Sequence, residues 1–102
     1  MKWLKLFENF DVEKFEEISM GRGIELHGTK IEMSNDTKKK INNISKLQTS
    51  EYAGGVMIGS IYKGAIIYEL PDEWFVVFIM GKHYKCDQFE GLVDLLKKHD
   101  FA

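Results

Sequence analysis

The chain has 102 residues, of which 44% are hydrophobic, with 14 Lys+Arg against 16 Asp+Glu, one Pro and one Cys. These values are typical of one globular α+β domain over residues 1–102 and exclude a two-domain enzyme. The formal net charge of -2 argues against wholesale binding to nucleic acid or to an anionic membrane, because both need a strongly basic surface.

The cysteine content and the first residues bear on location. A lone cysteine cannot form an internal disulfide, so the chain suits a reducing compartment. The opening residues 1–8 contain charges and lack the long apolar stretch of a signal peptide. We therefore expect a cytoplasmic protein without a membrane segment.

Residues 3–10 have the apolar spacing of a short amphipathic helix, with Trp3, Leu6, Phe7 and Phe10 on one side. The preferred interpretation is that this stripe covers the sheet. The alternative is that the helix is a ligand for a groove in a partner protein.

The next segment, residues 11–33, is harder to assign. Asp11 can cap a second helical turn over residues 12–18, and the alternative is that Phe15–Ile18 is already extended. Residues 23–33 carry apolar side chains around His27-Gly28-Thr29, which indicates a short hairpin.

A middle helix is predicted from Ser34 or Asp36, either of which can serve as N-cap, through Leu47. Residues 48–55 are polar and rich in glycine, so we expect them to be a connection. The apolar edge of this helix is narrow and consists of Ile41, Ile44 and Leu47.

The second half predicts an antiparallel meander. Short turns, among them Gly81-Lys82 with the glycine opening a type II′ turn, separate β-type segments. The segment 74–80 is apolar at both parities, so it should be a central strand buried on both faces. The predicted strands are residues 56–62, 65–70, 74–80 and 83–86.

A final helix is predicted over residues 88 to about 99, with Asp87 and Glu90 spaced as a capping box. The expected architecture is a meander of four to six short strands. The final helix should cover one face of the sheet, and the N-terminal or middle helix the other. With too little cover, the segment 74–80 or an edge strand 56–62 would pair with another copy, so a monomer and a homodimer both stay open.

Two blocks of the chain resemble small uncharacterised proteins of bacteriophages and marine viral metagenomes. The first is the segment 2–10, and the second combines Asp72-Glu73-Trp74-Phe75 with the segment 84–92. The resemblance implies a viral gene product that acts in the host bacterial cytoplasm. It assigns no catalytic residue.

Candidate catalytic and metal-binding groups have structural interpretations that we prefer. Cys86 precedes a helix N-terminus, with His83 or His99 as a conceivable base, but a cysteine at a strand end is usually an apolar filler. Asp72 and Glu73 are adjacent beside a proline, which suits a turn. We predict no catalytic residue, no metal and no cofactor.

One basic patch is a candidate binding site. Lysines on the middle helix, with tyrosines as stacking surfaces, suit single-stranded nucleic acid, although three consecutive lysines spread over about 200° of a helix. The residues of this candidate site are Lys38, Lys39, Lys40, Lys46, Tyr52 and Tyr62.

The leading functional hypothesis is a non-enzymatic one. A chain this small without catalytic spacing acts through an exposed face, so we expect a viral accessory protein that binds a host or viral protein. Inhibition of a host factor or of a defence system such as a CRISPR effector is one form of this. The alternative is an accessory protein that binds nucleic acid through the lysine patch.

Overall fold

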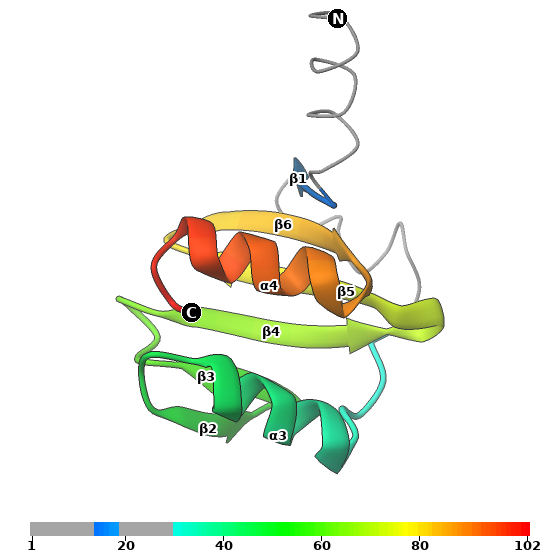
Figure 1. Cartoon of the computed structure of the whole chain (residues 1–102), viewed down its shortest axis with the longest axis horizontal. Coiled ribbons are helices and arrows are strands. Elements are labelled where there is room, and N and C mark those ends of the chain that lie inside the picture. The colour runs from blue at the N-terminus through cyan, green and yellow to red at the C-terminus, as the bar shows by residue number, and fades with distance from the viewer. Residues whose placement is uncertain (1–13, 19–29) are drawn as a thin grey trace, which may run out of the picture.

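The computed structural model describes residues 14–18 and 30–102, which form a six-stranded antiparallel sheet with two α-helices on one face (Figure 1). The strand order is β1-β6-β5-β4-β3-β2. This arrangement confirms the predicted α+β class. The elements are β1 (Phe15–Ile18), α3 (Asn35–Ile44), β2 (Thr49–Tyr52), β3 (Gly55–Ile58), β4 (Ala65–Leu70), the 3-10 turn η1 (Pro71–Glu73), β5 (Trp74–Ile79), β6 (Lys82–Asp87) and α4 (Gln88–Lys98).

Strand β5 lies inside the sheet, between β4 and β6. Its neighbouring residues Val76 and Val77 point to opposite faces, and both are 0% exposed. The prediction that residues 74–80 form a central strand buried on both faces is therefore confirmed, apart from Met80, which follows the strand.

Both described helices cover the same face. Ile41 of α3 belongs to one buried cluster with Leu92 and Leu95 of α4, above Ile67 and Val77 of the sheet. The option that the middle helix covers the opposite face is therefore wrong. The predicted helix over residues 3–10 lies outside the described residues.

Strand β1 settles the choice left open for residues 15–18. Phe15 pairs with Cys86 and Ile18 with His83, so the segment is extended and forms one edge of the sheet. The helical interpretation of these residues is wrong. Most of the predicted 23–33 hairpin lies outside the described residues, and Ile31 forms an isolated bridge with Glu69.

The connection predicted over residues 48–55 contains a strand that the sequence pattern did not indicate. Residues Thr49–Tyr52 pair with β3 as the second edge of the sheet. Only Thr49 is partly buried, so the segment lacks the apolar alternation that marks a strand. Strand β3 is consequently an inner strand and ends at Ile58, which rules out the edge strand predicted over 56–62.

The sequence predicts where both helices begin, but not where α3 ends or how α4 is capped. Ser34 caps α3 by accepting a hydrogen bond from the Thr37 amide, and the helix ends at Ile44 instead of Leu47. Helix α4 begins at Gln88 as predicted, but the Asp87 side chain makes no capping hydrogen bond. Glu90 instead forms an ion pair with Lys14 at 2.9 Å, so the predicted capping box is not formed.

The turn between β5 and β6 also differs from the prediction. Ile79 pairs with Lys82, so the turn residues are Met80 and Gly81, and both have positive φ, 49° and 81°. Two positive φ angles in a two-residue hairpin define type I′, so the predicted type II′ turn is wrong.

Candidate functional site

The lysines of α3 diverge from one another. Lys38 Nζ forms an ion pair with Glu51 of β2 at 3.0 Å, whereas Lys40 Nζ lies 5.6 Å from the centre of the Phe89 ring of α4. These opposite directions follow from the helix geometry, because residues two positions apart are turned by about 200° around the axis. The lysines thus serve contacts within the molecule on both sides of α3 and form no single basic face.

An open depression of ≈ 370 Å³ lies between α3 and the β2–β3 hairpin. Some of its polar groups contact one another, since Thr49 Oγ1 donates to Asn42 Oδ1 at 2.7 Å and Lys38 pairs with Glu51. Two pairs of lining side chains are therefore already engaged with each other. The lining residues are Lys38, Lys39, Asn42, Thr49, Ser50, Glu51 and Val56.

The two tyrosines of the predicted nucleic-acid site lie at opposite ends of the sheet. Tyr52 pairs with Gly55 at one end of the β2–β3 hairpin, whereas Tyr62 follows Ile58 at the other end. Lys46 lies at the Tyr62 end and forms an ion pair with Asp100. The structure therefore does not bring the six predicted residues together.

A different surface gathers exposed apolar side chains at the end of the sheet where β4 begins. Tyr62 is 88% exposed, Met80 79%, Ile61 54% and Leu47 45%. Large apolar side chains with so much exposure contribute little to a core. We call these four residues the end patch.

Strand register brings the segments of the end patch to one place. Ala65 pairs with Ile79, so the β3–β4 loop and the Met80-Gly81 turn leave the sheet at the same end. Leu47 lies beside that loop, because a Cβ atom at Gly59 would be 3.2 Å from Leu47 Cδ1 and 3.5 Å from Gly64 Cα. Three segments distant in sequence thus share this end.

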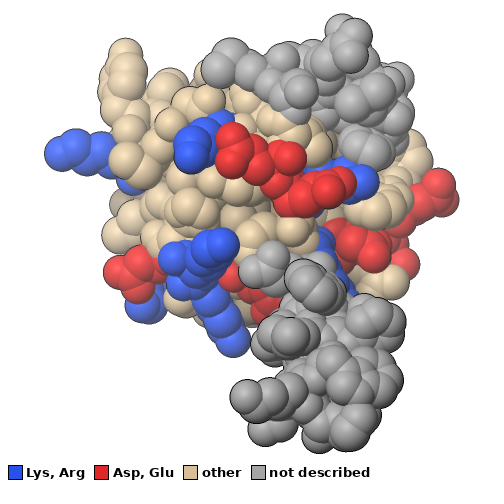
Figure 2. Space-filling view, turned by 90° about the horizontal axis from the view of Figure 1, so that it is seen from above, with Lys and Arg blue, Asp and Glu red and all other residues tan. Residues whose placement is uncertain are grey.

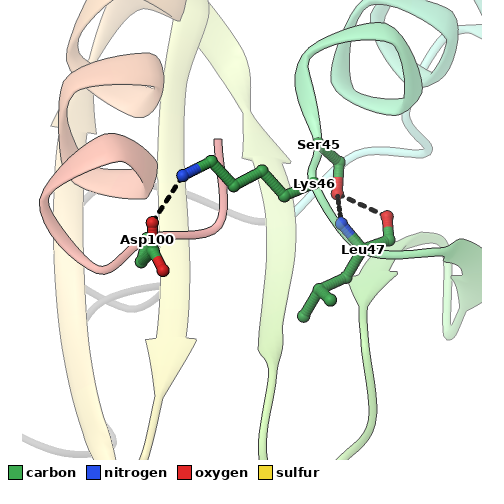
Figure 3. A network of polar contacts seen from close by, with 4 residues as sticks. All are labelled: Ser45, Lys46, Leu47 and Asp100. Atoms are coloured by element: carbon green, nitrogen blue, oxygen red, sulfur yellow. Dashed lines mark hydrogen bonds and ion pairs between the residues drawn. The ribbon is translucent and has the colours of Figure 1, made fainter.

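Polar contacts hold the α3–β2 connection in place (Figure 3). The Ser45 hydroxyl donates to the Leu47 carbonyl at 2.6 Å and accepts from the Leu47 amide at 3.1 Å. The Lys46 amide donates to the Phe101 carbonyl at 2.8 Å, and its side chain pairs with Asp100. The backbone that presents Leu47 is therefore fixed on both sides.

Lysines flank every segment of the end patch. Lys46 precedes Leu47, Lys63 follows Tyr62, and Lys82 follows the Met80-Gly81 turn, whereas residues 45–48, 59–64 and 80–82 contain no acid. The opposite end of the sheet carries acids in its connections, including Asp72 and Glu73. In Figure 2, basic and uncharged side chains project at the left end together with an acidic group, and acidic side chains project at the right end.

Burial shifts the pKa values of the titratable groups near β6. Cys86 is 0% exposed, and burial raises the pKa of its thiol to about 12, so it is not a thiolate at neutral pH. Burial lowers the pKa of His83, whose Nδ1 atom is buried without a hydrogen-bond partner among the described residues. Burial, then Lys98 and Lys82, lower the pKa of His99.

Within the part of the chain that the structure describes, no three His, Cys, Asp or Glu side chains gather as a metal site. In the same residues, neither helix is long and apolar enough to cross a membrane. Asp72 and Glu73 lie in the η1 turn, as their sequence context predicted.

The end patch was only partly visible in the sequence. Tyr62 was a predicted site residue, but as a stacking surface for nucleic acid. The sequence pattern places Leu47 on the apolar edge of the middle helix, Ile61 in the strand 56–62 and Met80 in the strand 74–80, since a pattern of apolar residues does not show where a strand or helix ends. A sequence signal for two of these residues was present, because Tyr62 precedes Lys63-Gly64 and Met80 precedes Gly81-Lys82.

Comparisons of the chain with models of protein families, with curated proteins and with solved structures find no match.

Proposed function

We propose that the chain acts by binding another protein through the end patch, without catalysis. The observation that carries this proposal is the group of exposed apolar side chains, led by Tyr62 and Met80, on connections that register fixes at one end of the sheet. Tyr and Met are enriched in protein interfaces, and a centre of apolar residues with a polar rim is their usual composition.

The side chain that occupies the Met80 position also supports the proposal. The Met80 φ of 49° lies in the left-handed region, where glycine or asparagine is less strained. Its side chain is exposed, so it returns little stability to the fold. Ala53 makes the equivalent turn with φ of 47°, so the turn does not require methionine, and the exposed apolar side chain is what favours a role in binding.

The end patch has only four residues, so it would form the centre of a larger interface. A stable complex buries about 800 Å² on each partner, or about 20–30 residues a side. Four side chains supply the apolar anchors of such a surface, and the adjoining lysines supply its rim. A few central residues usually carry most of the binding energy.

The viral context enters only through the resemblance to bacteriophage and marine viral proteins. We propose on that basis that the partner is a host or viral protein in a bacterial cytoplasm. Inhibition of a host factor or of a defence system such as a CRISPR effector belongs to the same proposal.

Site-specific photo-cross-linking tests the proposal. A benzophenone amino acid is placed at position 62 in one variant and at position 52 in a matched one, since both positions carry exposed tyrosines at opposite ends. Irradiation in a nuclease-treated bacterial lysate should give a discrete protein adduct from position 62 only. Equal adducts from both positions, or none from position 62, would contradict the proposal.

Nucleic-acid binding through Lys38, Lys39 and Lys40 is the alternative, and divergence of these side chains weakens it. Oligonucleotide affinity that falls steeply with salt and disappears on a triple Lys→Ala change would establish it in place of protein binding.

A further inference from the structure

We propose that the end patch recognises an acidic protein surface that carries apolar side chains. This inference rests on the proposed function and adds the chemical character of the partner. Its basis is that the apolar anchors and a set of lysines occupy the same connections, which contain no acid, while the nearby Asp100 is paired with Lys46.

The first step concerns which lysines keep their charge free for a partner. Asp100 pairs with Lys46, and its pKa is lowered by that hydrogen bond and charge. Lys63 and Lys82 form no ion pair with any described residue. These two lysines therefore supply the uncompensated positive charge of the surface.

The second step concerns the positions of those charges. Lys63 directly follows Tyr62, and Lys82 is separated from Met80 only by Gly81. A partner that covers Tyr62 and Met80 must come close to both ammonium groups. Like charges placed opposite each other at an interface repel, so a basic partner is disfavoured and an acidic one favoured.

The third step separates an acidic protein from other anionic surfaces. Polybasic segments that bind anionic lipid usually have about 4–8 Lys or Arg residues. The three segments of the end patch have Lys46, Lys63 and Lys82, of which Lys46 is already paired. Such a weakly basic surface with exposed Ile and Met side chains suits a protein better than a membrane or a phosphate backbone.

The test uses a synthetic peptide that alternates Asp and Glu with Leu and Phe, and a matched peptide with Lys at every acidic position. Titration calorimetry should detect binding of the acidic peptide only. The double variant Lys63→Glu/Lys82→Glu should bind it at least about tenfold more weakly, because two attractions become repulsions. The control Lys39→Glu/Lys40→Glu, which makes the same charge change on α3, should stay within about twofold.

A second pair of variants tests the apolar anchors. Ile61→Ser/Tyr62→Ser should weaken binding about tenfold or more, because apolar anchors dominate such interfaces. The matched control Ile31→Ser/Tyr52→Ser, which removes the same residue types from exposed positions outside the end patch, should change it little. Circular dichroism checks that each variant is folded.

The outcomes separate the two proposals. If the apolar variant loses binding and the charge reversal does not, docking at the end patch stands and the acidic partner is refuted. Both proposals fail if neither the apolar variant nor the charge reversal weakens binding. They also fail if the control Lys39→Glu/Lys40→Glu weakens binding. Tighter binding to phosphatidylserine vesicles than to the acidic peptide would refute the protein partner. Sedimentation tests the remaining occupant. If the protein self-associates and Lys63→Glu/Lys82→Glu abolishes that association, the end patch binds a second copy of the chain and the acidic partner is refuted.

Discussion

Two hairpin turns at opposite ends of the sheet have the same backbone form and different side chains. Ala53 and Gly54 join β2 to β3 with φ of 47° and 87°, and Met80 and Gly81 join β5 to β6 with φ of 49° and 81°. Alanine at the first position is enough to make the turn. The methionine therefore adds an exposed apolar side chain that the fold does not require.

The surroundings of the two turns extend this contrast. The Met80 turn shares its end of the sheet with Tyr62 and Ile61 and with lysines that form no ion pair to a described residue. Lys30, by contrast, donates to the carbonyl of Ala53 and so ties that turn to the preceding segment. The Met80 side chain is exposed to solvent, whereas the Ala53 turn is held by the hydrogen bond from Lys30.

The largest expected effect concerns the loop that presents Tyr62. A Cβ atom at Gly64 would lie 1.9 Å from the Ile58 carbonyl oxygen, which is backbone and cannot move aside. We expect Gly64→Ala to destabilise the protein by about 3 kcal/mol. Chemical denaturation measures this difference.

The matched substitution at the Met80 turn is Gly81→Ala. A Cβ atom there meets nothing within 4 Å, so only the strain of φ 81° remains. We expect a loss of about 1 kcal/mol. A Gly64→Ala variant no less stable than Gly81→Ala would show that the β3–β4 loop is not held as the structure has it.

A smaller effect tests whether Met80 serves binding instead of stability. Asparagine tolerates the left-handed region, so Met80→Asn and Ala53→Asn should each stabilise the protein by about 0.5 kcal/mol. Only Met80→Asn should weaken binding of the acidic peptide. Thermal unfolding and calorimetry measure the two properties, and a loss of stability in Met80→Asn alone would mean that the side chain supports the fold.

The smallest effect concerns pH. Burial lowers the pKa of His83 and of His99 from the usual 6.5, so the unfolded chain binds protons more readily than the folded one. The stability present above pH 6.5 should therefore fall as the pH is lowered below that value. Melting temperatures between pH 7.5 and 5.5 should show a shallow decline that His83→Gln/His99→Gln flattens, and an unchanged slope in that variant would contradict this assignment.

The sequence predicted the parts of the fold in which apolar spacing and turn residues agree. Strand β4 has the predicted bounds, β5 has its predicted central place, and α4 has its predicted start. Strand β2 escaped prediction because an edge strand with one half-buried residue has no apolar alternation. The capping box failed because Glu90 pairs with Lys14, which is 76 residues away in sequence.

The candidate site depended even more on contacts distant in sequence. Tyr62 and Met80 lie at the same end of the sheet only because β4 pairs with β5 in the register Ala65 to Ile79. The lysines of α3 looked alike in sequence, yet Lys38 and Lys40 turn to different neighbours. The sequence shows which exposed apolar and basic residues are present, but only the strand pairing shows which of them lie together.

Nuclear magnetic resonance of the whole chain with the acidic peptide tests the central claim most directly, because the two turns provide matched reporters. The claim predicts that the amide signal of Gly81 shifts in proportion to bound peptide while that of Gly54 stays in place. Equal shifts at both turns, or a shift at Gly54 alone, would contradict the assignment of the end patch as the docking surface.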